Sequence, residues 1–209
     1  MSSRLATLVR TGRRVPRSAA PLARLYRLAR ALAPDGFTAE QTTELAAVRA
    51  RIPAAIALRL RAEVAAALGL PERVLPLRLL TVQACGPVSL HDDKFRYPGV
   101  YFAIVVAHPG GLAVADHRAR AVAHAPGEIL LLDPYRRHAL VPVGRTACEQ
   151  PYERTHSPVH AERDQFLFLC FDVRRRFARA RFRARTGGGA ATSRPAASRP
   201  RRPTGRGRR

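Results

Sequence analysis

The chain has 209 residues and a formal net charge of +22, with 37 Lys and Arg against 15 Asp and Glu. All of the excess charge lies in two tails: residues 1–34 carry eight Arg, residues 174–209 carry fourteen, and neither contains an acidic residue. A hydrophobic content of 46% excludes a wholly disordered basic protein, and no apolar run approaches the ~20 residues of a membrane-spanning helix. The middle, residues 35–173, is electrically neutral and long enough to bury a core, so function is sought there first.

Residues 1–34 have the Arg-, Ala- and Ser-rich, acid-free composition of a mitochondrial transit peptide. Two structures fit this N-terminal arm: a short helix between Pro21 and Pro34, or a poorly ordered basic segment. The three cysteines, Cys85, Cys148 and Cys170, are widely spaced and form no C-x-x-C pair. They predict neither a disulfide framework nor a structural zinc site, and favour an intracellular location whose compartment stays unassigned.

Two helices are predicted next, over residues 39–52 and 54–68. The first is expected to begin at a capping box, Thr38-Ala39-Glu40-Gln41, in which the Thr hydroxyl and the Gln side chain satisfy free backbone N–H groups. Pro53 suits the first turn of the second helix, and Gly69 is a natural C-terminal stop.

From residue 77 the sequence consists of short apolar runs separated by Gly, Pro and charged turns. These runs are LRLLTVQA, VYFAIVVA, GLAVA, ARAVA, EILLLD, HALVPV and DQFLFLCFDV. Several short strands without helical periodicity between them predict an antiparallel sandwich or barrel over residues 77–173, packed against the helices. Residues 174–209, with a glycine run and repeated Ser-Arg-Pro, are predicted to be a disordered basic tail.

The segment Gln83–Asp93 contains the pattern most informative about chemistry, His91-Asp92-Asp93. In an extended segment residues i and i+2 point to one face, so His91 and Asp93 can converge while Asp92 turns away. An imidazole and a carboxylate supply two thirds of a 2-His-1-carboxylate triad, which leaves positions open on a bound iron ion. An ordinary hydrogen bond in a surface turn is the competing interpretation of the pair.

The surrounding order of motifs resembles the Fe(II)/2-oxoglutarate-dependent dioxygenases, particularly their prolyl-hydroxylase-like branch. His138 lies 45 residues after Asp93, and the intervening features occur in the family's order. These features are Cys85-Gly86 before H-x-D, then VYFAIVVA, Gly110-Gly111-Leu112, and Pro126-Gly127 with EILLLD before His138. The resemblance covers about residues 38–173 and implies a double-stranded β-helix (jelly-roll) barrel.

The resemblance also implies a ligand set and cofactors: His91, Asp93 and His138 would hold Fe(II), with 2-oxoglutarate as cosubstrate, O2, and ascorbate as an optional addition. A basic residue on the last strand would pair with the far carboxylate of 2-oxoglutarate, and the planar fork of Arg suits this role. Arg163, directly before DQFLFLCFDV, is favoured, Arg145 is the alternate, and Tyr101 is a further cosubstrate contact. His156 and His160, in a polar segment, are rival third ligands.

The leading hypothesis is therefore a hydroxylase acting on a protein side chain such as proline, or on a small molecule. A cupin-like metalloenzyme that does not use 2-oxoglutarate is a second reading of the same ligands. The alternative from another class is a non-catalytic β-barrel that binds nucleic acid through its arginine-rich tails, without sequence specificity. The two classes separate at the metal site, because tail binding does not depend on His138.

Overall fold

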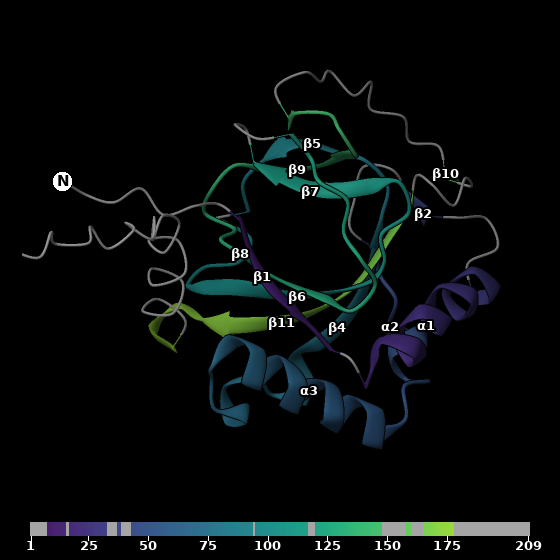
Figure 1. Ribbon diagram of the computed structural model, residues 1–209, viewed down its shortest axis with the longest axis vertical. Helices are drawn as coiled ribbons and strands as arrows, with labels where there is room; N and C mark the ends of the chain where they lie inside the picture. The colour runs from purple at the N-terminus through teal and green to yellow at the C-terminus, as the bar shows by residue number, and fades with distance from the viewer. Residues whose placement is uncertain are drawn as a thin grey trace, which may run out of the picture.

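The structure is a computed structural model that describes residues 8–15, 17–32, 37–38, 43–93, 95–116, 120–147, 158–159 and 165–177. It is mainly β, as the sequence predicted. Two antiparallel sheets face each other, and the helices cover the outer side of the larger sheet (Figure 1).

In chain order the elements are β1 (Leu8–Arg14), α1 (Ala19–Leu32), β2 (Phe37–Thr38), β3 (Thr43–Glu44), α2 (Ala46–Arg49), α3 (Ala54–Leu68), η1 (Glu72–Val74), η2 (Leu77–Leu79), β4 (Leu80–Cys85), β5 (Val88–His91), β6 (Val100–His108), β7 (Leu112–Asp116), β8 (Glu128–Leu132), β9 (His138–Pro142), β10 (Pro158–Val159) and β11 (Phe166–Arg174). The large sheet has the order β1-β8-β6-β11-β4-β3 and the small sheet β5-β9-β7, while β10 pairs with β2 alone. Both main sheets are open, with two edge strands each.

Side chains on the large sheet alternate between two separate cores, because successive residues of a strand point to opposite faces. One set packs against the helices; on β6 and β11 it includes Tyr101, Val105, Leu169 and Phe171. The other set fills the space between the two sheets. This inter-sheet core consists of Cys85, Phe102, Ile104, Val106, Leu112, Val114, Leu130, Leu132, Leu140, Phe166, Phe168 and Cys170.

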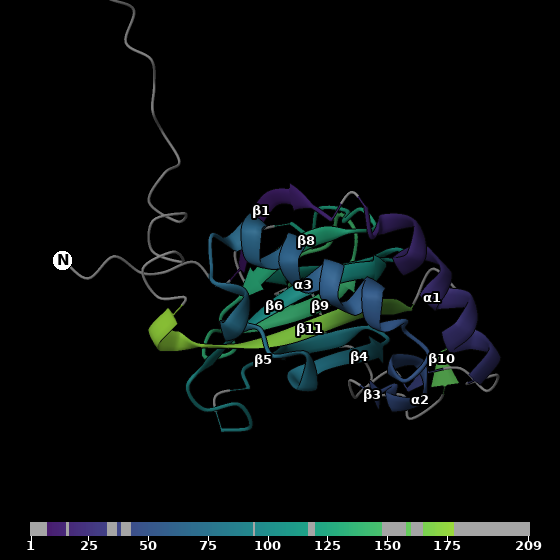
Figure 2. The same cartoon turned by 90° about the horizontal axis from the view of Figure 1, so that it is seen from below.

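Helix α3 lies across the outer face of the large sheet (Figure 2) and confirms the prediction for residues 54–68. Pro53 stands at its N-cap, where its missing N–H costs nothing, and Gly69 ends it with a φ of 64°. A left-handed backbone is strained for residues with a Cβ, so Gly is the residue that stops the helix here. Leu60, Val64, Ala65 and Leu68 are buried beneath the helix.

The prediction of a separate N-terminal arm over residues 1–34 is wrong for the part that the structure describes. Strand β1 pairs antiparallel with β8 and extends the large sheet, and α1 packs against β6. Of the two alternatives for this segment, a helix between Pro21 and Pro34 or a poorly ordered stretch, the structure shows the helix, which begins slightly earlier, at Ala19. Buried Val9, Val15 and Leu22 among exposed arginines explain why a basic segment belongs to the fold.

The helix predicted over residues 39–52 is also wrong. Residues 43–44 form β3, which pairs with β4 through Thr43 and Ala84, and only α2, four residues long, follows. Pairing with the sheet edge outweighs local helical periodicity. Within the predicted capping box Thr38 belongs to β2, and Glu40 and Gln41 lie outside the described residues.

Two further boundaries differ from the predictions. The β region begins at Leu80 rather than residue 77, because Leu77–Leu79 form a 3-10 turn, and the run ARAVA contributes an isolated bridge from Arg120 to Thr146 instead of a strand. At the other end the predicted tail starts too early: Arg174 is the last residue of β11, and residues 175–177 form a helical turn. The remainder of the tail, residues 178–209, lies outside the described residues.

Replacement of Phe171 by Ala should lower the free energy of unfolding by about 3–5 kcal/mol, because the ring is fully buried on the central strand β11. Urea unfolding at neutral pH, followed by circular dichroism, measures this change. Phe177→Ala is the matched control: that ring is 40% exposed, and the expected change is within about 0.5 kcal/mol. Equal effects of the two substitutions would contradict this description of the core.

Candidate metal centre

A β-bulge in β5 brings the first histidine to the inner face of the small sheet. Val88 pairs with Leu140 and His91 pairs with His138, so three steps along β5 match two along β9. The extra residue reverses the alternation, as bulges do when they re-aim a side chain. Val88 therefore packs against the inter-sheet core while Leu90 packs on the outer side of the small sheet. His91 lies opposite His138 as a result.

His91, Asp93 and His138 form a compact cluster. Oδ2 of Asp93 lies 3.4 Å from Nε2 of His138 and 3.7 Å from Nε2 of His91. The two imidazole rings lie 4.4 Å apart, centre to centre, and one ligand atom from each of the three residues lies within 4.8 Å of the others. The structure thus brings together the three residues predicted as iron ligands, although their separation along the chain is large.

Backbone carbonyl groups fix the orientation of both rings. Nδ1 of His91 donates to the Ser89 carbonyl at 2.7 Å, and Nδ1 of His138 donates to the Arg136 carbonyl at 2.9 Å. A carbonyl oxygen can only accept, so the hydrogen atom in each bond is on Nδ1. When neutral, each imidazole directs the lone pair of Nε2 at Asp93, which is the arrangement that metal-binding histidines use.

The charges of the cluster stabilise one another. Burial raises the pKa of Asp93, but hydrogen bonds and charge from His138 and His91 outweigh burial and hold the pKa well below its ordinary value of 3.8. Burial lowers the pKa of His91, and the hydrogen bonds to Asp93 and to Ser89 reverse this, so the pKa is raised above 6.5. A proton on an imidazole thus occupies the place that a cation would take.

The three side chains fit a metal ion with right-angled coordination. With bonds of about 2.1 Å, ligand atoms at right angles are about 3 Å apart, close to the 3.4 Å between Asp93 and His138. His91 requires a small further approach, and its side chain, 37% exposed, is the most accessible of the three. Two neutral imidazoles and one carboxylate are the donor set of non-haem iron sites.

Three neighbours of the cluster were missed by the sequence analysis. Asp116 pairs directly with His138 across β7 and β9, and shares the inward face with Leu112 and Val114. Asp172 follows Phe168 and Cys170 in alternation on the inward face of β11, and burial raises its pKa. Tyr97 has a pKa raised by burial and further by the charges of Asp93 and Asp172. The alternation within DQFLFLCFDV was the signal that could have identified Asp172.

The structure does not bring the expected cosubstrate residues to the cluster. Tyr101 is buried on the helix-facing side of β6, the opposite face from the inter-sheet core. Arg145 is exposed in the turn after β9, roughly 13 Å or more along the strand from His138. Arg163, like His156 and His160, lies outside the described residues. Within β11 the same alternation places a basic side chain on the inward face only at the exposed end of the strand, at Arg174.

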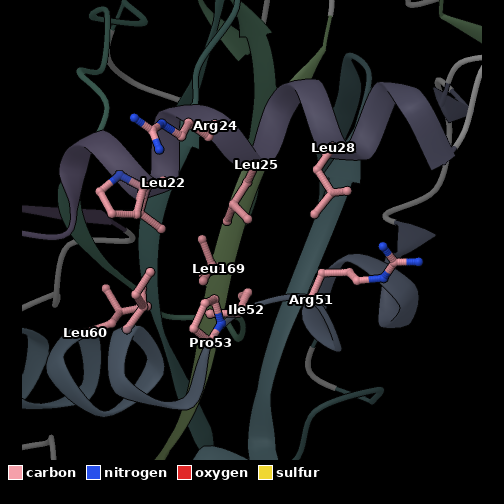
Figure 3. A pocket seen from close by; sticks show the side chains of 11 residues that line it. Leu22, Arg24, Leu25, Leu28, Arg51, Ile52, Pro53, Leu60 and Leu169 are labelled. Carbon is pink, nitrogen blue, oxygen red and sulfur yellow. The ribbon is translucent and has the colours of Figure 1, made fainter.

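A separate cavity of about 250 Å³ lies in the helical layer (Figure 3). Leu22, Leu25 and Leu28 of α1 form one wall, Ile52, Pro53 and Leu60 form the other, and Leu169 lies at its base, with Arg24 and Arg51 at the periphery. Leu169 points away from the inter-sheet core, so the large sheet separates this cavity from the cluster of His91, Asp93 and His138.

Comparisons of this chain with protein-family models, with curated proteins and with solved structures gave no match. Within the described residues, no helix is both long and apolar enough to cross a membrane.

The affinity of the protein for a divalent cation should rise with pH through the raised pKa of His91, because the metal must displace the proton from that imidazole. Titration of EDTA-treated protein with Co(II) at about pH 6, 7 and 8, followed by visible absorbance, measures this affinity across the range in which histidine titrates. His91→Asn should weaken binding and flatten the pH dependence. A wild-type Kd that does not change from pH 6 to 8 would contradict the assignment.

Proposed function

We propose that the protein is a non-haem Fe(II) oxygenase that uses 2-oxoglutarate as cosubstrate. The observation that carries the proposal is the convergence of His91, Asp93 and His138, with each Nδ1 bound to a carbonyl group and each Nε2 directed inward. This facial arrangement of two imidazoles and one carboxylate leaves coordination positions for a cosubstrate and oxygen. When bound, the iron supplies oxygen activation coupled to decarboxylation of 2-oxoglutarate to succinate and CO2.

The residues of the chain have distinct roles in this proposal. His91 and His138 supply neutral donors held at fixed angles, and Asp93 supplies the charge that offsets the cation. The inter-sheet core beside them is apolar, which excludes water from the reaction space and strengthens every charge interaction inside it. The open side lies at His91, the most exposed member of the cluster, and substrate would approach there.

The arrangement of the strands supports a double-stranded β-helix as the finer description of the fold. His91 ends β5 and His138 begins β9, two neighbouring strands of the small sheet, and β11 is central in the large sheet facing them. Polar residues at the end of a sandwich of two antiparallel sheets suit a ligand site. The last-strand arginine remains assigned to Arg163, because Arg145 lies at the far end of β9.

The reaction that we propose is hydroxylation of an unactivated C–H bond, with a protein side chain such as proline as the first substrate to test. The basic tail serves targeting or substrate delivery in this scheme. Residues 178–209 contain eleven Arg and no acidic residue, a composition that binds polyanions through salt-sensitive phosphate contacts. Nucleic-acid binding without catalysis is the second candidate, and it predicts a protein whose cluster is irrelevant to activity.

Asp93→Asn should abolish Fe(II)-dependent conversion of 2-oxoglutarate to succinate and weaken Co(II) binding, because the amide lacks the negative charge and one acceptor. The neighbouring substitution Asp92→Asn is the matched control. It should leave succinate formation intact and change Co(II) binding far less, since Asp92 supplies no ligand atom and acts on His91 only through its charge. Succinate is measured by mass spectrometry with Fe(II), ascorbate and 2-oxoglutarate present, first without and then with candidate peptides.

Deletion of residues 178–209 should leave succinate formation intact and remove salt-sensitive binding to nucleic acid. The deletion begins after Phe177, so that β11 and every described residue of the helical turn after it are retained. The oxygenase proposal fails if wild-type protein neither binds metal nor forms succinate, or if Asp93→Asn and Asp92→Asn behave alike.

A further inference from the structure

The segment between β8 and β9, residues 133–137, contacts two of the three residues in the cluster. The Pro134 carbonyl accepts from the backbone N–H of Asp93 at 2.8 Å. Two residues later, the Arg136 carbonyl accepts from Nδ1 of His138 at 2.9 Å. The position of this one segment therefore decides both the backbone position of the carboxylate ligand and the ring orientation of the more buried histidine.

Arg175 anchors the same segment from the outer side of the large sheet. Its two terminal nitrogens donate to the two carboxylate oxygens of Asp133, at 2.8 and 3.0 Å. The Asp133 side chain is almost fully buried, with 1% exposed, and its Oδ1 also accepts from the backbone N–H of Tyr135. A forked bond to a buried carboxylate is strong and restricts geometry, because both nitrogens must stay in register with both oxygens.

Two aromatic rings hold the guanidinium group in place. Its central carbon lies 4.4 Å from the centre of the Tyr101 ring and 4.2 Å from the centre of the Tyr135 ring. Gly99 closes the arrangement: its N–H donates to the Tyr135 hydroxyl at 2.8 Å, and its carbonyl accepts from the Arg175 N–H at 2.9 Å. Arg175, Asp133, Tyr135 and Tyr101 form what we call the Arg175 clamp.

We propose that Arg175 is a positioning residue of the metal centre, acting through Asp133 and the segment 133–137 on Asp93 and His138. The metal-affinity part of the test rests on the proposed function. The positioning of Asp93 and His138 is a property of the metal-free protein. It gives Tyr101 a role other than cosubstrate contact, since its ring supports the guanidinium group. The proposal also gives a structural role to Arg175, which the sequence composition placed in the basic tail.

The deciding experiment compares the double variant Asp133→Asn/Arg175→Gln with the wild type. The double variant leaves no unpaired buried charge, so it tests the clamp with the least damage to the fold. In metal-free protein the Asp93 amide should exchange with deuterium faster, because the Pro134 carbonyl no longer holds a fixed position. Co(II) affinity should fall about tenfold, the lower end of what loss of a supporting partner costs a metal site.

The matched control is Arg10→Gln, which removes another forked arginine–carboxylate pair at the opposite end of β8. Nε and a terminal nitrogen of Arg10 donate to the Glu128 carboxylate at 2.6 and 2.8 Å. A general loosening of the sheet would speed Asp93 exchange in both variants, whereas the clamp predicts a change only with Arg175. Tyr135→Phe, which removes the acceptor for the Gly99 N–H, should shift both readouts in the same direction but less, and it decides the question if the double variant does not fold.

The proposal is overturned if the double variant, folded by circular dichroism, retains wild-type protection of the Asp93 amide and wild-type Co(II) affinity. It is equally overturned if Arg10→Gln produces the same changes. Wild-type protein that binds no Co(II) would end the oxygenase proposal, and amide exchange at Asp93 would still decide whether the clamp positions that residue.

Discussion

The bulge in β5 is the constraint on which the site depends. A strand without the extra residue would place Val88 and His91 on opposite faces, because the offset of three is odd, and the imidazole would point away from His138. Next to the bulge, the Ser89 carbonyl accepts from Nδ1 of His91, which leaves Nε2 of the neutral ring facing Asp93. On its other side β9 pairs with β7 in regular register, and Asp116 is the pairing partner of His138 there.

The polar groups between the sheets are gathered at the two ends of an apolar core. At one end are His91, Asp93 and His138; at the other, Glu128 accepts from Arg10 and lies 3.3 Å from His124. Burial raises the pKa of Glu128, but hydrogen bonds from His124 and Arg10 prevail and hold it at about 2. At the second end, Glu128 is thus paired with both Arg10 and His124. At the first end, the Asp93 carboxylate is shared by two imidazoles, and a cation can displace the proton that they hold.

Local signals in the sequence were sufficient for helix 54–68 and for most strands. His138 was grouped with His91 and Asp93 through the order of motifs along the chain, and the structure brings the three residues together. What failed was information that only tertiary pairing supplies. Thr43 and Glu44 pair with β4 although the sequence pattern predicted a helix there. In the arginine-rich start of the chain, the buried side chains of Val9 and Leu22 pack into the core. Composition placed Arg175 in the tail, because composition cannot show that Arg175 forms an ion pair with the buried Asp133. The residue types of β5 do not indicate that the strand contains a bulge.

The central place of β11 has a consequence for how the protein is made. This strand pairs with both β4 and β6, yet among the strands that the structure describes it is the last to be synthesised, directly followed by Arg175. Until it emerges, β4 and β6 each present an unpaired edge that invites aggregation, and the contacts it makes close long loops of chain. Arg175 follows β11 directly, so its forked bond to Asp133, in the segment that contacts Asp93 and His138, forms only after synthesis has passed residue 175.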